Sequence, residues 1–290
     1  MKKDNSIEES LIKAQTFVSR ELGYDINVTI VPEKNAFAAT DGKSIALGAE
    51  FIKSLKDDAQ ELYGNIIDII GEYLGQKLTI DDIFNTTIEL ITAHELGHIL
   101  RKHPPTAQAW LKFTDELAQS LYDQHVEKQE LIPEDCRPFI QQARCRLSQQ
   151  IREIDADTQA IKILTEIRDK PSILCAVMLN RFTSEKIATE EERTSSHNNP
   201  RWFFPQYHRD HPRDDIRLFS EMQVLNANHP LTESEQEVLQ LIEQNAENGE
   251  HRFKLCYSKI LNEEHRDIYE KIHECWKEMD SYIEANMPLL

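Results

Sequence analysis

The stretch Ile91–His103, ITAHELGHILRKH, carries two histidines and a glutamate whose types and spacing suit zinc chemistry. On a helix, His94 and His98 lie one turn plus about 40° apart, so both imidazoles project from one face. Two imidazoles placed in this way can share a zinc ion, and Glu95 would lie beside the open coordination position as a general base. The alternative is a surface helix with two unrelated histidines, since so short a pattern arises by chance in roughly a few per cent of chains.

A catalytic zinc usually has three protein ligands, and the segment REIDADTQAIKIL, residues 152–164, supplies a candidate for the third. Glu153 and Asp157 are four residues apart, so they share one face of the helix predicted there. Glu153 could bind the metal, and Asp157 could accept the second N–H of a ligand histidine and fix its tautomer. Alone, this stretch is typical of a charged helix face; together with the histidine pair it favours a metal site.

The residues around the histidine pair predict the helix that must position it. Thr79 can cap a helix whose apolar positions continue through IELITA and ILRK, and Pro104–Pro105 must stop it. A metal site on this helix would therefore lie near its C-terminal end.

One small sheet of three strands is predicted before this helix. The segment INVTIV is rich in β-branched residues and alternates in polarity, and the Asp41–Gly42 pair is a strong hairpin turn within Thr40–Lys43. The predicted strands are Ile26–Val31, Ala36–Ala38 and Ser44–Leu47.

The rest of the chain is predicted to be helical, so the fold class is α+β and mostly helical. Only 8 of the 290 residues are glycine, and good helix formers are plentiful. Residues 183–200 are polar and unpatterned, which predicts a loop. Helices are predicted at residues 7–22, 57–74, 106–130, 172–182, 232–246 and 252–285, with another that starts after His211–Pro212. Residues 134–168 are predicted to form one long helix or two broken ones.

Composition excludes several classes of function. The net charge is −18, and no basic stripe is present that could neutralise phosphates, so neither nucleic acid nor an anionic membrane is an expected partner. The five cysteines include no CxxC pair, which argues against a thiolate zinc cluster and a disulfide framework. No run of about 20 apolar residues is present, so no membrane span is predicted. We expect a cytoplasmic protein.

Four segments, in order, resemble motifs of the gluzincin endopeptidases that include the CAAX prenyl endopeptidases and the bacterial stress protease HtpX. NAFAATDGKSIALG resembles their NAFA hairpin and active-site edge strand, and AHELGHILRKH resembles their HExxHxxxxH helix. EIDAD resembles ExxAD, and HPRDDIR resembles HPxxxxR. The motifs span Asn35 to Arg217, and their order and the chain length are also similar to those of the phage-exclusion protease Lit.

The resemblance implies a zincin-like core with one zinc ion per chain, held by His94, His98 and Glu153. It further implies that Glu95 is the general base and that His211 donates to the oxyanion, while Arg217 holds the His211 segment in place. An extended protein or peptide substrate would pair with the edge strand by strand addition. That strand comprises Ser44, Ile45, Ala46 and Leu47.

The chain also departs from the resembling family. The membrane-embedded branches have spans that this chain lacks, so isoprenylated substrates are not expected, and Asp210 stands where a threonine usually precedes the late HP. The tail has no recognised counterpart, which suggests a metallopeptidase domain over residues 1–225 and a helical extension over residues 226–290 packed on it. Two alternatives stay open: a non-catalytic, zinc-stabilised binding or chaperone-like module, and a regulator that cleaves one repressor.

Overall fold

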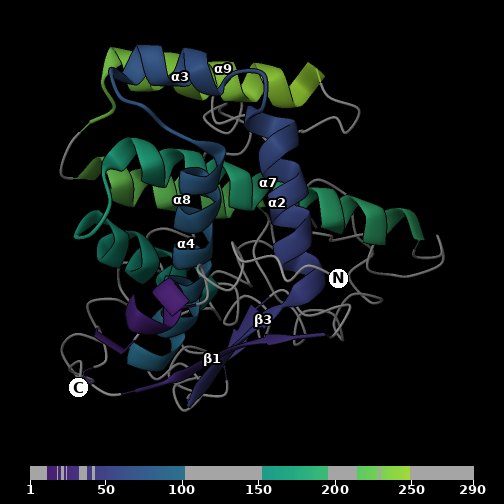
Figure 1. Ribbon diagram of the computed structural model, residues 1–290, viewed down its shortest axis with the longest axis vertical. Coiled ribbons are helices and arrows are strands. Elements are labelled where there is room, and N and C mark those ends of the chain that lie inside the picture. The colour runs from purple at the N-terminus through teal and green to yellow at the C-terminus, as the bar shows by residue number, and fades with distance from the viewer. Residues whose placement is uncertain are drawn as a thin grey trace, which may run out of the picture.

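A computed structural model of the chain describes residues 12–17, 19–20, 23, 25–32, 38–40, 43–101, 152–194, 214–227 and 230–248. In this part of the chain helices predominate, and one small sheet lies at one end of the helical body (Figure 1).

The sheet has three strands in the order β1–β3–β2. β1 (Asn27–Val31) runs parallel to β3 (Ser44–Gly48), and β2 (Ala38–Thr40) runs antiparallel to β3. The prediction is wrong at Thr40, which belongs to β2 and not to the following turn. Its hydroxyl donates to the carbonyl of Ser44 at 2.7 Å, a bond across the hairpin that suits the last residue of a strand.

β3 is the central strand of this sheet, which contradicts its predicted role as an edge strand for substrate. Ile45, Ala46 and Leu47 pair with β1 on one side and with β2 on the other, and Ser44 pairs with β1. Their backbone groups are engaged within the sheet, so an extended peptide would have to add to an outer strand. β2, which packs against the helix that carries the histidine pair, is the outer strand nearest to it.

The single helix predicted over residues 57–74 is two helices. α2 (Ala49–Tyr63) begins directly after β3, and α3 (Ile67–Leu74) follows a turn at residues 64–66. Gly64 and Asn65 are weak helix formers, and the Tyr63 hydroxyl anchors the end of α2 by donating to the Cys175 carbonyl at 2.6 Å. Gly75, with φ 64°, ends α3 in the left-handed conformation.

α4 (Ile80–Leu100) runs through the middle of the molecule, and from Ile83 to Gly97 every residue except Asn85 is buried. Thr79 caps it as predicted, in a reciprocal capping box with Asp82. The buried threonines of α4 donate to carbonyls one turn back, which satisfies their hydroxyls inside the core.

α7 (Lys170–Thr194) is longer than predicted, because residues 183–194 continue the helix and are not a loop. The polar composition of this stretch misled the prediction. Thr183 is fully buried, and the Lys186 ammonium donates to Asp58 at 2.6 Å and to Glu61 at 3.0 Å on α2. These contacts give a polar segment a fixed position, and residues 195–200 lie outside the described part.

Further helical segments complete the described structure. Residues 12–17 and 19–20 are helical, within the first predicted helix, and residues 152–165 are helical. α8 (Asp214–Ala227) packs on α7, and α9 (Glu233–Asn248) lies beside α3 at the end far from the sheet (Figure 1). The proposed division at residue 225 stays a prediction. Among the described helices, none is long and apolar enough to cross a membrane.

Candidate metal centre

The last turns of α4 carry His94, Glu95 and His98. His94 and Glu95 are 9% and 6% exposed, so both side chains lie within the body of the protein and not on a solvated helix face. The two imidazole rings are nearly perpendicular, with centroids 4.8 Å apart. This arrangement contradicts the alternative of two unrelated surface histidines.

The helix at residues 152–165 passes unusually close to α4 at Gly97. A Cβ atom placed on Gly97 would lie 3.0 Å from the Ala156 carbonyl oxygen and 3.1 Å from the Ala156 Cα. Only glycine allows this approach without displacement of a backbone. Because Glu153 lies one turn before Ala156, the approach brings its carboxylate to the two histidines.

Two imidazole nitrogens and one carboxylate group converge at this crossing. The Nε2 atoms of His94 and His98 are 3.1 Å apart, and the Glu153 carboxylate lies 3.2 Å from the first and 3.5 Å from the second. Ligand atoms about 2.0–2.1 Å from a tetrahedral zinc ion are about 3.3 Å from one another. The spacing and the two-imidazole, one-carboxylate donor set therefore fit a zinc ion, and other divalent ions accept the same set.

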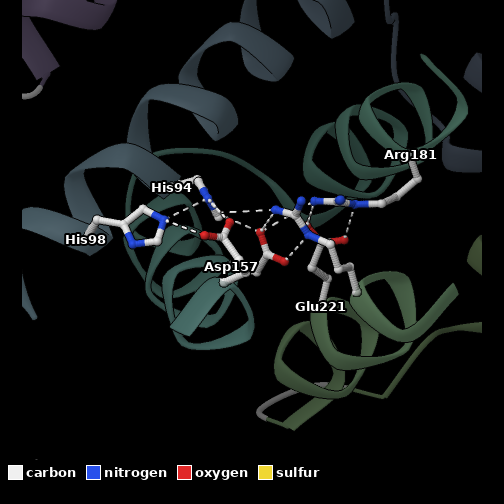
Figure 2. Close-up of polar contacts among 7 residues, drawn as sticks. His94, His98, Asp157, Arg181 and Glu221 are labelled. Carbon is white, nitrogen blue, oxygen red and sulfur yellow. Dashed lines mark hydrogen bonds and ion pairs between the residues drawn. The ribbon is translucent and has the colours of Figure 1, made fainter. Parts of the chain in front are cut away.

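Asp157 contacts the Nδ1 atom of His94, across the ring from the Nε2 atom that faces His98 (Figure 2). Its Oδ1 lies 2.8 Å from Nδ1 of His94, which leaves Nε2 directed toward His98 and Glu153. A carboxylate in this position favours the tautomer that ligates through Nε2.

Two arginines hold the Asp157 carboxylate in turn. Arg217 of α8 donates from Nε to Oδ2 and from Nη2 to Oδ1, both at 2.6 Å. Arg181 of α7 approaches Oδ1 at 3.4 Å and forms a two-pronged ion pair with Glu221 of α8, at 3.0 and 2.8 Å. The network joins four segments that are far apart in the sequence (Figure 2).

These contacts shift the pKa values of the site in opposite directions. Burial alone lowers the pKa of His94, but the charge and hydrogen bond of Asp157 outweigh burial and raise this pKa to about 10. Burial raises the pKa of Asp157, yet Arg217 and Arg181 hold it well below its usual range. Burial raises the pKa of Glu95, although the nearby histidines oppose it. A metal ion at this site would have to compete with the proton that the raised pKa of His94 favours, because a ligating imidazole is neutral.

Glu221 behaves differently from Asp157. Burial raises its pKa to about 7, against the lowering effect of Arg181, and the charge of Asp157 contributes to the rise. Glu221 is therefore ionised above neutral pH and partly protonated near it.

The structure brings together most of the site residues predicted from sequence. His94, Glu95, His98, Glu153, Asp157 and Arg217 all lie at this crossing. Arg217 binds Asp157, a contact that the prediction did not include. His211 lies outside the described residues, so its role stays a prediction.

Sequence reasoning missed Arg181, Glu221 and the buried pair of Arg101 with Asp155, whose Nε–Oδ2 distance is 2.9 Å. Two signals were available. Arg181 is the first charged residue after the apolar run ILCAVML, and Glu221 follows Arg217 by four residues on one helix face.

Comparison with known proteins identifies one family. Residues 4–221, which are 218 of the 290 residues, match the model of a family described as Peptidase family M48. Neither a curated protein nor a solved structure matches the chain.

Proposed function

The chain belongs to peptidase family M48, a family of zinc-dependent metallopeptidases, and from this premise we propose that it is an endopeptidase acting at the crossing of α4 with residues 152–165. The observation that carries the proposal is the mutual approach of the Nε2 atoms of His94 and His98 and the two carboxylate oxygens of Glu153, at 3.1–3.5 Å. Assignment to the CAAX prenyl endopeptidase, HtpX or Lit branch stays a prediction.

The proposed ligands are those three residues, with one zinc ion per chain. The chemistry that zinc supplies in such a site is Lewis acidity, which lowers the pKa of water toward neutrality and polarises a carbonyl. Asp157 fixes the His94 ring by accepting from Nδ1, so the ring keeps its orientation without a substrate.

We assign the proton transfers to Glu95. It follows the first ligand directly on α4, it is buried, and its carboxylate would take a proton from the attacking water and deliver it to the leaving amine. His211 is proposed as the donor to the oxyanion, where loss of such a donor costs about 3 kcal/mol of transition-state stabilisation.

The substrate is proposed to bind as an added strand on β2 (Ala38–Thr40). β3 is engaged on both sides, whereas β2 is an outer strand that packs against α4. Main-chain pairing there would hold an extended peptide with little demand on its side chains. Narrow or regulated specificity is the other part of the proposal.

Glu95→Gln tests this function directly. The variant should keep its zinc and its thermal unfolding temperature, because amide and carboxylate have the same shape, while cleavage of an unfolded peptide library falls at least about a hundredfold. Equal cleavage by wild type and variant would overturn the assignment. One zinc per chain with no cleavage in either protein would favour the non-catalytic binding module, and rapid cleavage of casein would count against narrow specificity.

A further inference from the structure

A buried ion pair beyond the proposed ligands contacts the metal centre through Asp157. Arg181 and Glu221 are each 1% exposed, and neither belongs to the segments that suggested a metal site. Arg181 divides its Nη2 between two acceptors, Oε1 of Glu221 at 2.8 Å and Oδ1 of Asp157 at 3.4 Å. Any change in this pair therefore acts directly on the carboxylate that holds His94.

Among the described side chains of this cluster, the charges of the contacting groups offset one another. Asp157 and Glu221 carry two negative charges above neutral pH, and Arg181 and Arg217 carry two positive charges. Without the charge of Glu221, the surroundings of Asp157 would be one unit more positive, and Arg181 would lose the carboxylate that accepts its two short hydrogen bonds. An uncompensated positive charge behind His94 disfavours a divalent cation in front of it, because the interior screens charge weakly.

The two arginines also differ in what they hold. Arg217 donates a hydrogen bond of 2.6 Å to each oxygen of Asp157, and this bidentate contact fixes the plane of the carboxylate. Arg181 makes one long contact to Asp157 and two short ones to Glu221. Orientation of Asp157 thus depends mainly on Arg217, while the second arginine and Glu221 together decide the charge around it.

We propose that Arg181 and Glu221 are positioning residues that set the metal affinity of the site, because the Glu221 carboxylate offsets the positive charge that Arg181 places beside Asp157. This inference rests on the proposed function, since it requires that His94, His98 and Glu153 bind zinc. Neither residue is among the proposed ligands; Arg181 contacts Asp157, and Glu221 acts through Arg181.

The test is a set of zinc affinities, measured by competition with a chromophoric chelator at mildly alkaline pH, where Glu221 is ionised. Glu221→Gln keeps the shape but removes the negative charge, so zinc affinity should fall about tenfold or more. Glu221→Asp keeps the charge, and Arg181→Met combined with Glu221→Gln restores the net charge of the wild type; both should stay within about threefold of wild type.

A purely structural role gives another pattern. If Arg181 and Glu221 only pack the helices together, the double variant should bind zinc at least as weakly as Glu221→Gln, and that result would overturn the inference. Unchanged zinc affinity in Glu221→Gln would overturn it as well. If Glu221→Gln does not fold, judged by circular dichroism, the double variant decides: zinc affinity within about threefold of wild type is expected, and a larger loss would overturn the inference.

Failure of the inference can be told from failure of the proposed function. Absence of zinc binding by the wild type would overturn both. Zinc bound by the wild type, with equal affinity in every variant, would overturn only the role of Arg181 and Glu221. Visible spectra of the cobalt(II)-loaded proteins add a readout of ligand geometry, which should be unchanged in the double variant.

Discussion

Gly97→Ala should damage the metal centre without unfolding the protein. The added Cβ would meet the Ala156 carbonyl oxygen at 3.0 Å, the Ala156 Cα at 3.1 Å and the Gln159 Cβ at 3.3 Å. Two of these atoms belong to a helix backbone, so the methyl group cannot be accommodated by rotation of a side chain. The helix at residues 152–165 must move away from α4 by a few tenths of an ångström.

Two opposing terms decide the effect of Gly97→Ala on stability. Replacing glycine by alanine inside a helix stabilises by about 1 kcal/mol, while overpacking a core contact costs about 1–3 kcal/mol. The net change in the free energy of unfolding should therefore lie between zero and a loss of about 2 kcal/mol. Metal affinity has no such compensation, because the same movement carries Glu153 away from His94 and His98.

The expected signature is a loss of zinc affinity larger than the loss of stability. We expect a decrease in zinc affinity of about tenfold to a hundredfold, as for other changes that misplace a ligand. Urea unfolding of the metal-free protein and chelator competition on the same preparation separate the two quantities. Wild-type zinc affinity in Gly97→Ala, together with a gain of about 1 kcal/mol in stability, would refute the argument from close approach.

Three further predictions concern the scaffold. Arg101→Met removes the 2.9 Å ion pair of the fully buried Asp155 carboxylate and should lower the free energy of unfolding, measured with urea, by about 3–5 kcal/mol. Adding Asp155→Asn should recover part of this loss, and a loss below about 1 kcal/mol would contradict the prediction. Thr79→Ala removes the cap of α4 and should cost about 1 kcal/mol, and an unchanged unfolding midpoint would count against the cap. Burial raises the pKa of Cys175 to about 12, so its thiol should not react with iodoacetamide at neutral pH in the native chain. Peptide mapping should find Cys175 modified only after unfolding, and modification of the native chain would contradict this prediction.

Local spacing made the first part of the site predictable. His94 and His98 share a helix face because they are four residues apart, and the cap at Thr79 and the prolines after the helix bound it. The pairing of Asp157 with a ligand histidine was also predictable from residue type, since the second nitrogen of a ligating imidazole needs an acceptor.

Long-range order was not predictable in the same way. The order β1–β3–β2 depends on which strands pair, and a single sequence shows where strands form but not which one becomes central. The role of β3 (Ser44–Gly48) was therefore assigned wrongly, and β2 takes the outer position. The pair of Arg181 with Glu221 spans 40 residues and two helices, so no local pattern joins its members.

Composition misled the prediction where tertiary contacts decide. Residues 183–194 lack apolar periodicity and were predicted to form a loop, yet they extend α7, and Lys186 joins that helix to Asp58 and Glu61 of α2. Helix formers such as Glu, Lys and Ala in this stretch were a signal in favour of the helix.

The zinc content of the freshly purified chain, measured by mass spectrometry beside Glu153→Ala, tests the central claim most directly. Glu153 is the proposed ligand that only the fold brings to the histidine pair, through the close approach at Gly97. We predict about one zinc ion per chain in the wild type and almost none in Glu153→Ala after the same dialysis. Full zinc occupancy in Glu153→Ala, or no zinc in the wild type even after zinc is offered, would contradict the account.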